Sequence, residues 1–112
     1  MNMVKAELIN LFMHLCRDLG KKAYVSESDL KALDKWLSEP GYRACEIVPY
    51  NTNGCWFLDY ASCYGGWMIK ERCGESGECD PVGSSRSSIQ EMYKQICFAR
   101  EFIQILKKGH TN

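Results

Sequence analysis

The hydrophobic pattern of the chain changes its period twice, which predicts helices at both ends and strands between them. Apolar residues recur every three or four positions over 4–19, which is the helical period, and a glycine follows directly. A second helix is predicted to begin after Ser26 or Ser28, because Ser26 and Asp29 have the spacing of a capping box. Pro40 ends this helix. We therefore expect two helices before the first strand.

The middle of the chain alternates between apolar and polar residues, which predicts three antiparallel strands in a meander. The first strand is expected over 44–50, and the next two come from the aromatic-rich run 54–73. Two-residue hairpin loops are predicted at two pairs that contain glycine, Asn53-Gly54 and Gly65-Gly66. Loops of that length place Tyr64 opposite Trp67.

Side chains in a strand point alternately to two faces, so this register divides the meander into a core face and an outer face. The predicted core face consists of Cys45, Ile47, Trp56, Leu58, Tyr60, Tyr64, Trp67 and Ile69. The outer face carries a candidate partner-binding site made of Tyr50, Phe57, Asp59, Met68, Lys70 and Arg72. Asp59 is expected opposite Arg72, in a cross-strand ion pair. The alternative is that one of the N-terminal helices covers this face.

The last part of the chain is predicted to be an exposed loop followed by a long helix. The segment 74–85 is rich in glycine, serine and acidic residues and has no periodicity, which is typical of a loop. Ser88 and Glu91 have capping-box spacing, and an apolar stripe then continues to Leu106. The long helix is therefore expected to pack this stripe against the sheet.

These elements predict one α+β domain over 1–112, with two N-terminal helices, a three-stranded antiparallel meander and a long C-terminal helix (ααβββα). The chain has 112 residues, of which 46% are hydrophobic, and this suffices for one modest core. Residues 1–2 and 107–112 are expected to fray. No apolar run approaches the roughly 18 residues that span a bilayer, so we expect a soluble, cytoplasmic protein with no membrane partner.

A second apolar stripe on the last helix requires a separate explanation. Phe98, Phe102 and Ile105 lie beside the core stripe, so the helix is apolar around more of its circumference than one sheet face requires. Packing against the first helix is the explanation we favour. The alternative is a dimer seam, so the chain is expected to be a monomer or a homodimer.

The cysteines favour a reduced protein. There are seven of them, an odd number, and Cys16 and Cys97 lie within helical apolar patterns, where a free thiol behaves as a small hydrophobic residue. We expect no disulfide between Cys73 and Cys79. The chain has no C-x2-C or H-x3-H pair, so no metal site and no cofactor are predicted. A thiol-dependent or metal-dependent protein is a third-ranked alternative.

No catalytic residues are identified. His14 is the only histidine within a predicted element, and its place among apolar residues favours a structural role. Glu71 is expected to project to the core face near Tyr60, which is unusual for a carboxyl group but is no catalytic pair. The glycines match neither common nucleotide-binding motif. We therefore predict a protein that is not an enzyme.

The charge balance disfavours nucleic-acid binding. Lysine and arginine number 14, as do aspartate and glutamate, so the net charge is zero. The element order is that of double-stranded RNA-binding domains, but their basic cluster at the start of the last helix is missing here. Nucleic-acid binding or transcriptional regulation is the alternative function, through Arg17, Lys21, Lys22 and the exposed face of the second helix.

Three features of the second half of the chain carry a family resemblance: Gly65-Gly66-Trp67-x-Ile69, a loop over 74–83 with Asp80, and Arg86 followed by Glu91-Met92-Tyr93. Over 54–106 this arrangement resembles the C-terminal half of small phage-encoded and prophage-encoded proteins of unassigned function. The resemblance implies an accessory protein of a mobile element that binds and inhibits a host complex, for example a CRISPR defence complex. It implies no catalytic residues. A non-enzymatic protein-binding function is therefore the leading hypothesis.

Overall fold

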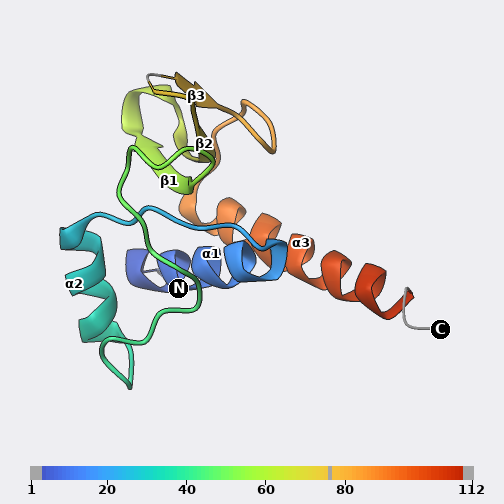
Figure 1. Cartoon of the computed structure of the whole chain (residues 1–112), viewed down its shortest axis with the longest axis horizontal. Helices are drawn as coiled ribbons and strands as arrows, with labels where there is room; N and C mark the ends of the chain where they lie inside the picture. The colour runs from blue at the N-terminus through green and yellow to red at the C-terminus, as the bar shows by residue number, and fades with distance from the viewer. Residues whose placement is uncertain (1–3, 76, 110–112) are drawn as a thin grey trace.

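The computed structural model describes residues 4–75 and 77–109. These residues form three helices and a three-stranded antiparallel sheet, in the order helix, helix, strands, helix, which confirms the predicted α+β class (Figure 1). The elements are α1 (Lys5–Leu19), α2 (Glu27–Trp36), β1 (Trp56–Ala61), β2 (Gly66–Cys73), β3 (Gly77–Cys79) and α3 (Ile89–Gly109), with a 3-10 turn at Ser62–Tyr64. Residues 107–109, which were expected to fray, continue α3, and the other residues predicted to fray lie outside the described residues.

Local sequence signals define the ends of the first two helices. Gly20, the glycine after the first apolar segment, has a φ of 69° and ends α1, and its N–H donates to the Arg17 carbonyl. The Ser26 hydroxyl accepts the N–H of Asp29 at 3.3 Å and so caps the start of α2. α2 then packs beside α1 and buries Leu33 completely (Figure 1).

The predicted strand over 44–50 is wrong. This segment is extended, but it runs beside the chain that follows α1 instead of pairing with β1. The Ala23 N–H donates to the Glu46 carbonyl and the Val48 N–H donates to the Ala23 carbonyl, both at 2.9 Å. The third strand is β3, which lies in the segment predicted to be an exposed loop. Alternation in a sequence indicates an extended segment without identifying the segment that pairs with it.

The register of β1 with β2 differs from the predicted one by four residues. Tyr60, rather than Tyr64, lies opposite Trp67. The chain passes through the 3-10 turn at Ser62–Tyr64 before it reverses at Gly65, so the loop is longer than two residues. Because four is an even number, the shift leaves each side chain on its predicted face of the sheet.

The main core lies between the core face of the sheet and the helices α1 and α3 (Figure 1). Its buried residues are Leu8, Phe12, Leu15, Cys16, Ala23, Trp56, Trp67, Ile69, Met92 and Ile96. Cys45, Ile47 and Leu58 are partly buried and also contact a smaller cluster beside α2. Two residues predicted for the core, Tyr60 and Tyr64, are exposed. Tyr64 lies in the 3-10 turn, and Tyr60 lies near the end of β1, where its ring contacts the Trp67 ring.

A backbone bridge joins β2 to the segment that precedes α3. Trp67 and Ser87 exchange two N–H···O=C hydrogen bonds of 2.8 Å. Gly66 permits this close approach, because its φ is 117° and a Cβ atom at this position would collide with the Ser87 carbonyl oxygen. The bridge therefore sets where α3 begins beneath the sheet.

We expect Gly66→Ala to lower the free energy of unfolding by about 2–4 kcal/mol, because the methyl group must displace the Ser87 backbone in addition to straining φ. Gly65→Ala is the matched control. Gly65 also has a positive φ, of 98°, but a Cβ atom there would stand 3.8 Å from Arg86 Cβ, an ordinary contact. Its expected cost is about 1–2 kcal/mol. Urea denaturation measures both variants, and equal losses would contradict the role given to the Ser87 contact.

Candidate functional site

The apolar part of the predicted outer-face site is covered by other side chains. Phe57 and Met68 are buried, with exposed fractions of 6% and 5%. The rings of Tyr24 and Tyr50 stand edge-on to Phe57, at centroid distances of 6.5 and 5.3 Å. Both tyrosines lie in loops, so the cover of Phe57 does not come from an N-terminal helix. Of the three apolar residues predicted for this site, Tyr50 alone is exposed.

The predicted ion pair between Asp59 and Arg72 is wrong. The register places Met68, and not Arg72, opposite Asp59. The Asp59 carboxylate instead accepts a hydrogen bond of 2.6 Å from Arg86 Nη2. Arg86 also donates to the Gly66 carbonyl at 3.0 Å, so it links the two strands to the segment before α3.

Arg72 organises the turn between β2 and β3. Its guanidinium lies over the Tyr50 ring, with Cζ 4.8 Å from the centroid, and donates to the carbonyl groups of Glu75 and Gly77. The Tyr50 hydroxyl donates to the Glu78 carboxylate, and this hydrogen bond raises the pKa of Tyr50. Both residues of the predicted site therefore have partners within the chain.

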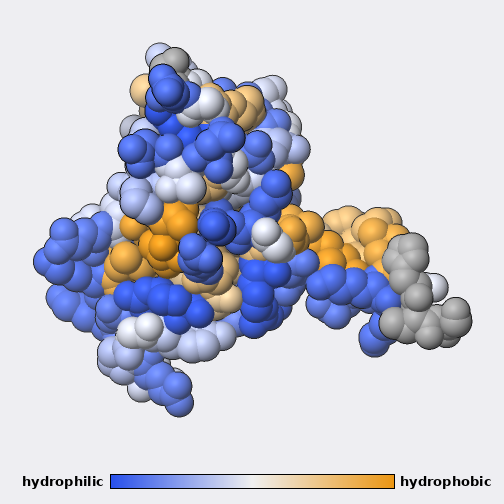
Figure 2. Space-filling model, in the orientation of Figure 1, coloured by the Kyte–Doolittle hydropathy of each residue, from blue (hydrophilic) through white to orange (hydrophobic). Residues whose placement is uncertain are grey.

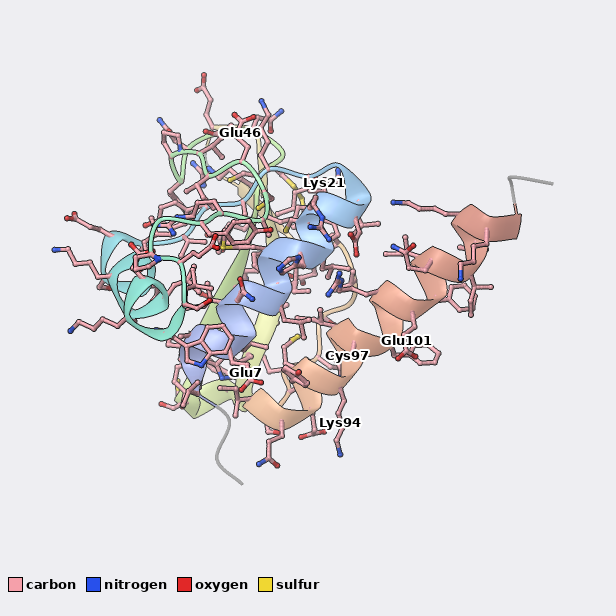
Figure 3. All side chains as sticks on the ribbon, turned by 90° about the horizontal axis from the view of Figure 1, so that it is seen from below. Glu7, Lys21, Glu46, Lys94, Cys97 and Glu101 are labelled. Carbon is pink, nitrogen blue, oxygen red and sulfur yellow. A yellow bond between two sulfur atoms is a disulfide. The ribbon has the colours of Figure 1, made fainter. Side chains whose placement is uncertain are left out.

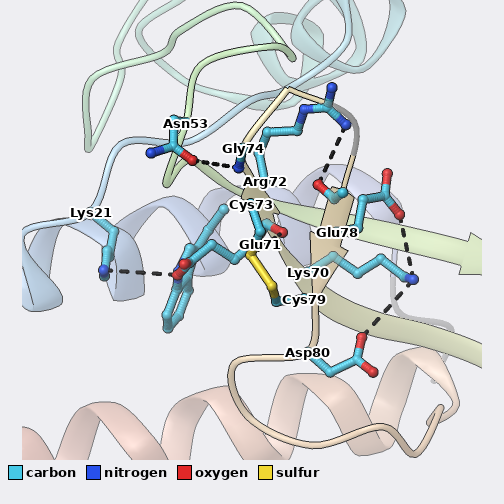
Figure 4. Close-up of a disulfide and its surroundings, with 12 residues drawn as sticks. Lys21, Asn53, Lys70, Glu71, Arg72, Cys73, Gly74, Glu78, Cys79 and Asp80 are labelled. Atoms are coloured by element: carbon cyan, nitrogen blue, oxygen red, sulfur yellow. Dashed lines mark hydrogen bonds and ion pairs between the residues drawn. A yellow bond between two sulfur atoms is a disulfide. The ribbon is translucent and has the colours of Figure 1, made fainter.

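Lys70 and a disulfide hold β3 against β2 (Figure 4). The Lys70 ammonium lies 3.5 Å from Glu78 and 4.0 Å from Asp80. Cys73 and Cys79 form a disulfide, which corrects the expectation that both are reduced. The two sulfur atoms meet because β3 returns along β2. This end of the sheet is therefore cross-linked by its own side chains.

Glu71 and His14, the two residues considered for acid–base chemistry, both have contacts that favour a structural role. Glu71 lies opposite Trp56, and its carboxylate accepts a hydrogen bond of 2.6 Å from the indole Nε1. Burial, together with the positive charges of Arg17 and Arg100, lowers the pKa of His14. Glu71 thus provides the hydrogen-bond acceptor for the indole N–H of Trp56, and the surroundings of His14 favour its neutral form.

Cys16 and Cys45 form a thiol pair at the core. Cys16 is fully buried, and its hydrogen bond to Cys45, together with burial, raises the pKa of Cys16. The same hydrogen bond lowers the pKa of the half-buried Cys45. Across 4–75 and 77–109, no group of three His, Cys, Asp or Glu side chains is arranged to hold a metal ion.

Four cations of the alternative nucleic-acid surface lie near a carboxylate. The pairs are Arg17–Asp18 at 3.4 Å, Lys21–Glu71 at 3.9 Å and Lys22–Glu46 at 3.7 Å. On α2, Lys31 lies 3.4 Å from Glu27. Binding to phosphates depends on cationic charge that the protein has not already neutralised. The fold therefore brings these cations to acidic neighbours and builds no strongly positive face from them.

The second half of α3 carries a group of exposed apolar side chains, which we call the α3 stripe. It consists of Phe98, Phe102, Ile105 and Leu106, with exposed fractions of 68%, 52%, 64% and 51%. The two phenyl rings stack on each other, with their centroids 6.2 Å apart. Figure 2 shows this end of α3 projecting from the molecule, hydrophobic along one side and hydrophilic along the other.

The prediction that the first helix covers Phe98, Phe102 and Ile105 is wrong. α3 packs on α1 and β2 through the side that carries Met92 and Ile96, and Phe98 lies on the other side; in addition, α1 ends at Leu19 while α3 continues (Figure 1). Sequence reasoning identified three residues of the α3 stripe. It assigned Leu106 to the core stripe, because helical spacing does not reveal where the supporting helix stops.

Asp18 anchors α3 at the point where this support ends. Its side chain is only 5% exposed and accepts a hydrogen bond of 2.8 Å from Arg100 Nε, while its backbone carbonyl accepts one of 3.2 Å from Lys107 Nζ. Burial opposes the ionisation of Asp18, but hydrogen bonds and charges from Arg100 and then Arg17 outweigh it and lower the pKa. We call the Asp18–Arg100 pair the α3 clamp.

A cavity of about 180 Å³ lies beside the first half of α3. It lies between β2, the segment before α3 and α3 itself, and its lining includes Met68, Val82, Met92 and Ala99. Val82 is exposed at the rim, and Ala99 directly follows Phe98 in the helix. Successive residues of a helix point about 100° apart, so the cavity lies on a different side of α3 from Phe98.

The sequence matches no protein-family model, no curated protein and no solved structure. The resemblance to phage-encoded accessory proteins, and the host complex that it implies, therefore stay predictions. None of the helices in the described part of the chain is both long enough and apolar enough to cross a membrane.

The α3 clamp should show a coupling energy of about 1–3 kcal/mol at about pH 7 in a double-mutant cycle of Asp18→Ala and Arg100→Ala. The folded-state pKa of Asp18 lies below its ordinary value of 3.8, so its contribution is complete above that pH. It is lost as the pH falls through the folded-state pKa. Urea denaturation of the four proteins at about pH 7 and about pH 2.5 measures this loss. A coupling energy that does not change between these conditions would rule out the ionised clamp.

Proposed function

We propose that this chain is a non-enzymatic protein-interaction module and that the α3 stripe is its binding surface. The observation that carries the proposal is the exposure of four large apolar side chains along one side of a projecting helix. Contiguous apolar patches on soluble proteins commonly mark sites of interaction with other proteins. The residues first selected on the sheet are unsuited to this role, because Phe57 and Met68 are buried.

The size of the α3 stripe fits a binding surface of moderate affinity. Taking about 200 Å² for a fully exposed large side chain, the four residues expose about 450 Å². Burial of this area contributes about 11 kcal/mol, at roughly 25 cal/mol per Å². Association costs about 4–15 kcal/mol in lost freedom of motion. The two quantities are of similar size, so the α3 stripe supplies much of the binding energy without giving irreversible association.

The shape of α3 supports the same proposal. Residues 101–109 extend beyond the α3 clamp and project from the body of the domain, to which Ile103 and Lys107 still connect them (Figure 1). Isolated helices shorter than about 12 residues are marginal in water. A partner that packs on the α3 stripe stabilises this helical segment as well as covering its apolar side chains.

Site-specific photocrosslinking tests the proposal. A benzophenone amino acid placed at Phe102 should yield covalent adducts with another polypeptide in cells of the organism that encodes the chain. The matched control carries the same group at Gln104, which is exposed two residues away and lies on the opposite side of the helix. Absence of adducts from Phe102, or equal yields from both positions, would contradict the proposed binding surface.

A further inference from the structure

We infer that the partner of the α3 stripe is a second copy of this chain, bound through antiparallel pairing of the two projecting halves of α3. This inference rests on the proposed function, because it identifies the occupant of the same surface. A two-fold interface uses one patch twice, so a single apolar stripe on each copy is sufficient. The projection of α3 lets the two helix ends overlap while the two domain bodies lie at opposite ends of the pair (Figure 1).

The spacing of the α3 stripe matches a coiled-coil seam. Phe98, Phe102 and Ile105 are separated by four and then three residues, the alternation that keeps side chains along one line of contact between two helices. The next position in this pattern is Gly109. In an antiparallel pair, Phe102 of one copy then packs opposite Ile105 of the other. Phe98 packs opposite Gly109, whose missing side chain leaves room for the phenyl ring.

Charges beside the α3 stripe select this register. Lys94, Glu101 and Lys108 follow one another at intervals of seven residues and therefore share one flank of the seam. Lys94 and Glu101 are both exposed, and Lys94 points away from α1 (Figure 3). In the proposed register Glu101 of each copy approaches Lys108 of the other. A shift of seven residues would instead bring the two Glu101 side chains together, which is unfavourable.

The buried area and the net charge are both compatible with such a dimer. Two copies of the α3 stripe together remove about 900 Å² of apolar surface from water, before flanking residues are counted. A specific interface needs about 1,000 Å² in total. The formal net charge of the chain is zero, so no long-range repulsion opposes the approach of two copies.

Sedimentation equilibrium of the purified full chain is the direct test. We expect a concentration-dependent rise in mass from the 12.8 kDa of one chain toward twice that value. Phe102→Asp should weaken the dimer at least about tenfold, because it places a charge at the centre of the seam. Gln104→Asp adds the same charge on the opposite side of α3 and should leave the dissociation constant unchanged. A dimer that Phe102→Asp does not weaken would overturn the proposed pairing.

Exchanging the charges of Glu101 and Lys108 tests the register of the proposed helix pair and leaves every apolar residue in place. Glu101→Lys should weaken the dimer several-fold, because it faces Lys108 of the other copy. Adding Lys108→Glu to the same chain should restore the association. Weakening without restoration would overturn the register. Circular dichroism of each variant reports whether α3 is retained.

The crosslinking and sedimentation results separate this inference from the proposed function. An adduct of two identical chains from Phe102, with a dimer in solution, supports both. A purified chain that stays monomeric, together with an adduct to a different protein, overturns the second copy as partner and leaves the proposed function standing. A monomeric chain that yields no adduct overturns both.

Discussion

The position at which α1 ends limits how much of α3 can be buried. Up to Arg100, α3 has α1 and β2 against it, and Met92 and Ile96 are buried there. The chain leaves α1 at Gly20, and after Arg100 Ile103 still packs against the core while Phe102, Ile105 and Leu106 are exposed. The α3 clamp forms at this boundary and sets the direction in which the helix projects. The α3 stripe is therefore exposed because it lies on the side of α3 turned away from the core residues Ile96 and Ile103, and no other element covers that side.

At the opposite end of the domain, around β2 and β3, the charged side chains form their interactions with other groups of the same chain. Arg72, Lys70 and the Cys73–Cys79 disulfide all stabilise the short strand β3, and Arg86 joins Asp59 to the segment before α3. Charged groups that already have such partners gain little from a new ligand, because binding must first break the existing interaction. This contrast favours recognition through apolar burial on α3 over recognition through charge on the sheet.

Local signals in the sequence predicted more of the fold than the pairing of its strands. The ends of α1 and α2 follow from Gly20 and Ser26, whose effects extend over a few neighbouring residues. The faces of β1 and β2 were also predicted correctly, although their register was wrong, because an error of four residues preserves the alternation. β3 was missed because a strand of three residues has too few positions to show a period.

The sequence by itself determined the α+β class, the order of the elements and the apolar character of Phe98, Phe102 and Ile105, since all of these depend on the period and composition of short segments. Tertiary structure alone decided that Phe57 is covered, that Cys73 meets Cys79 and that the α3 stripe faces solvent. Each of these outcomes depends on which distant segments come together. A helical pattern shows that one side of a helix is apolar, but burial of that side depends on the length and position of a neighbouring helix.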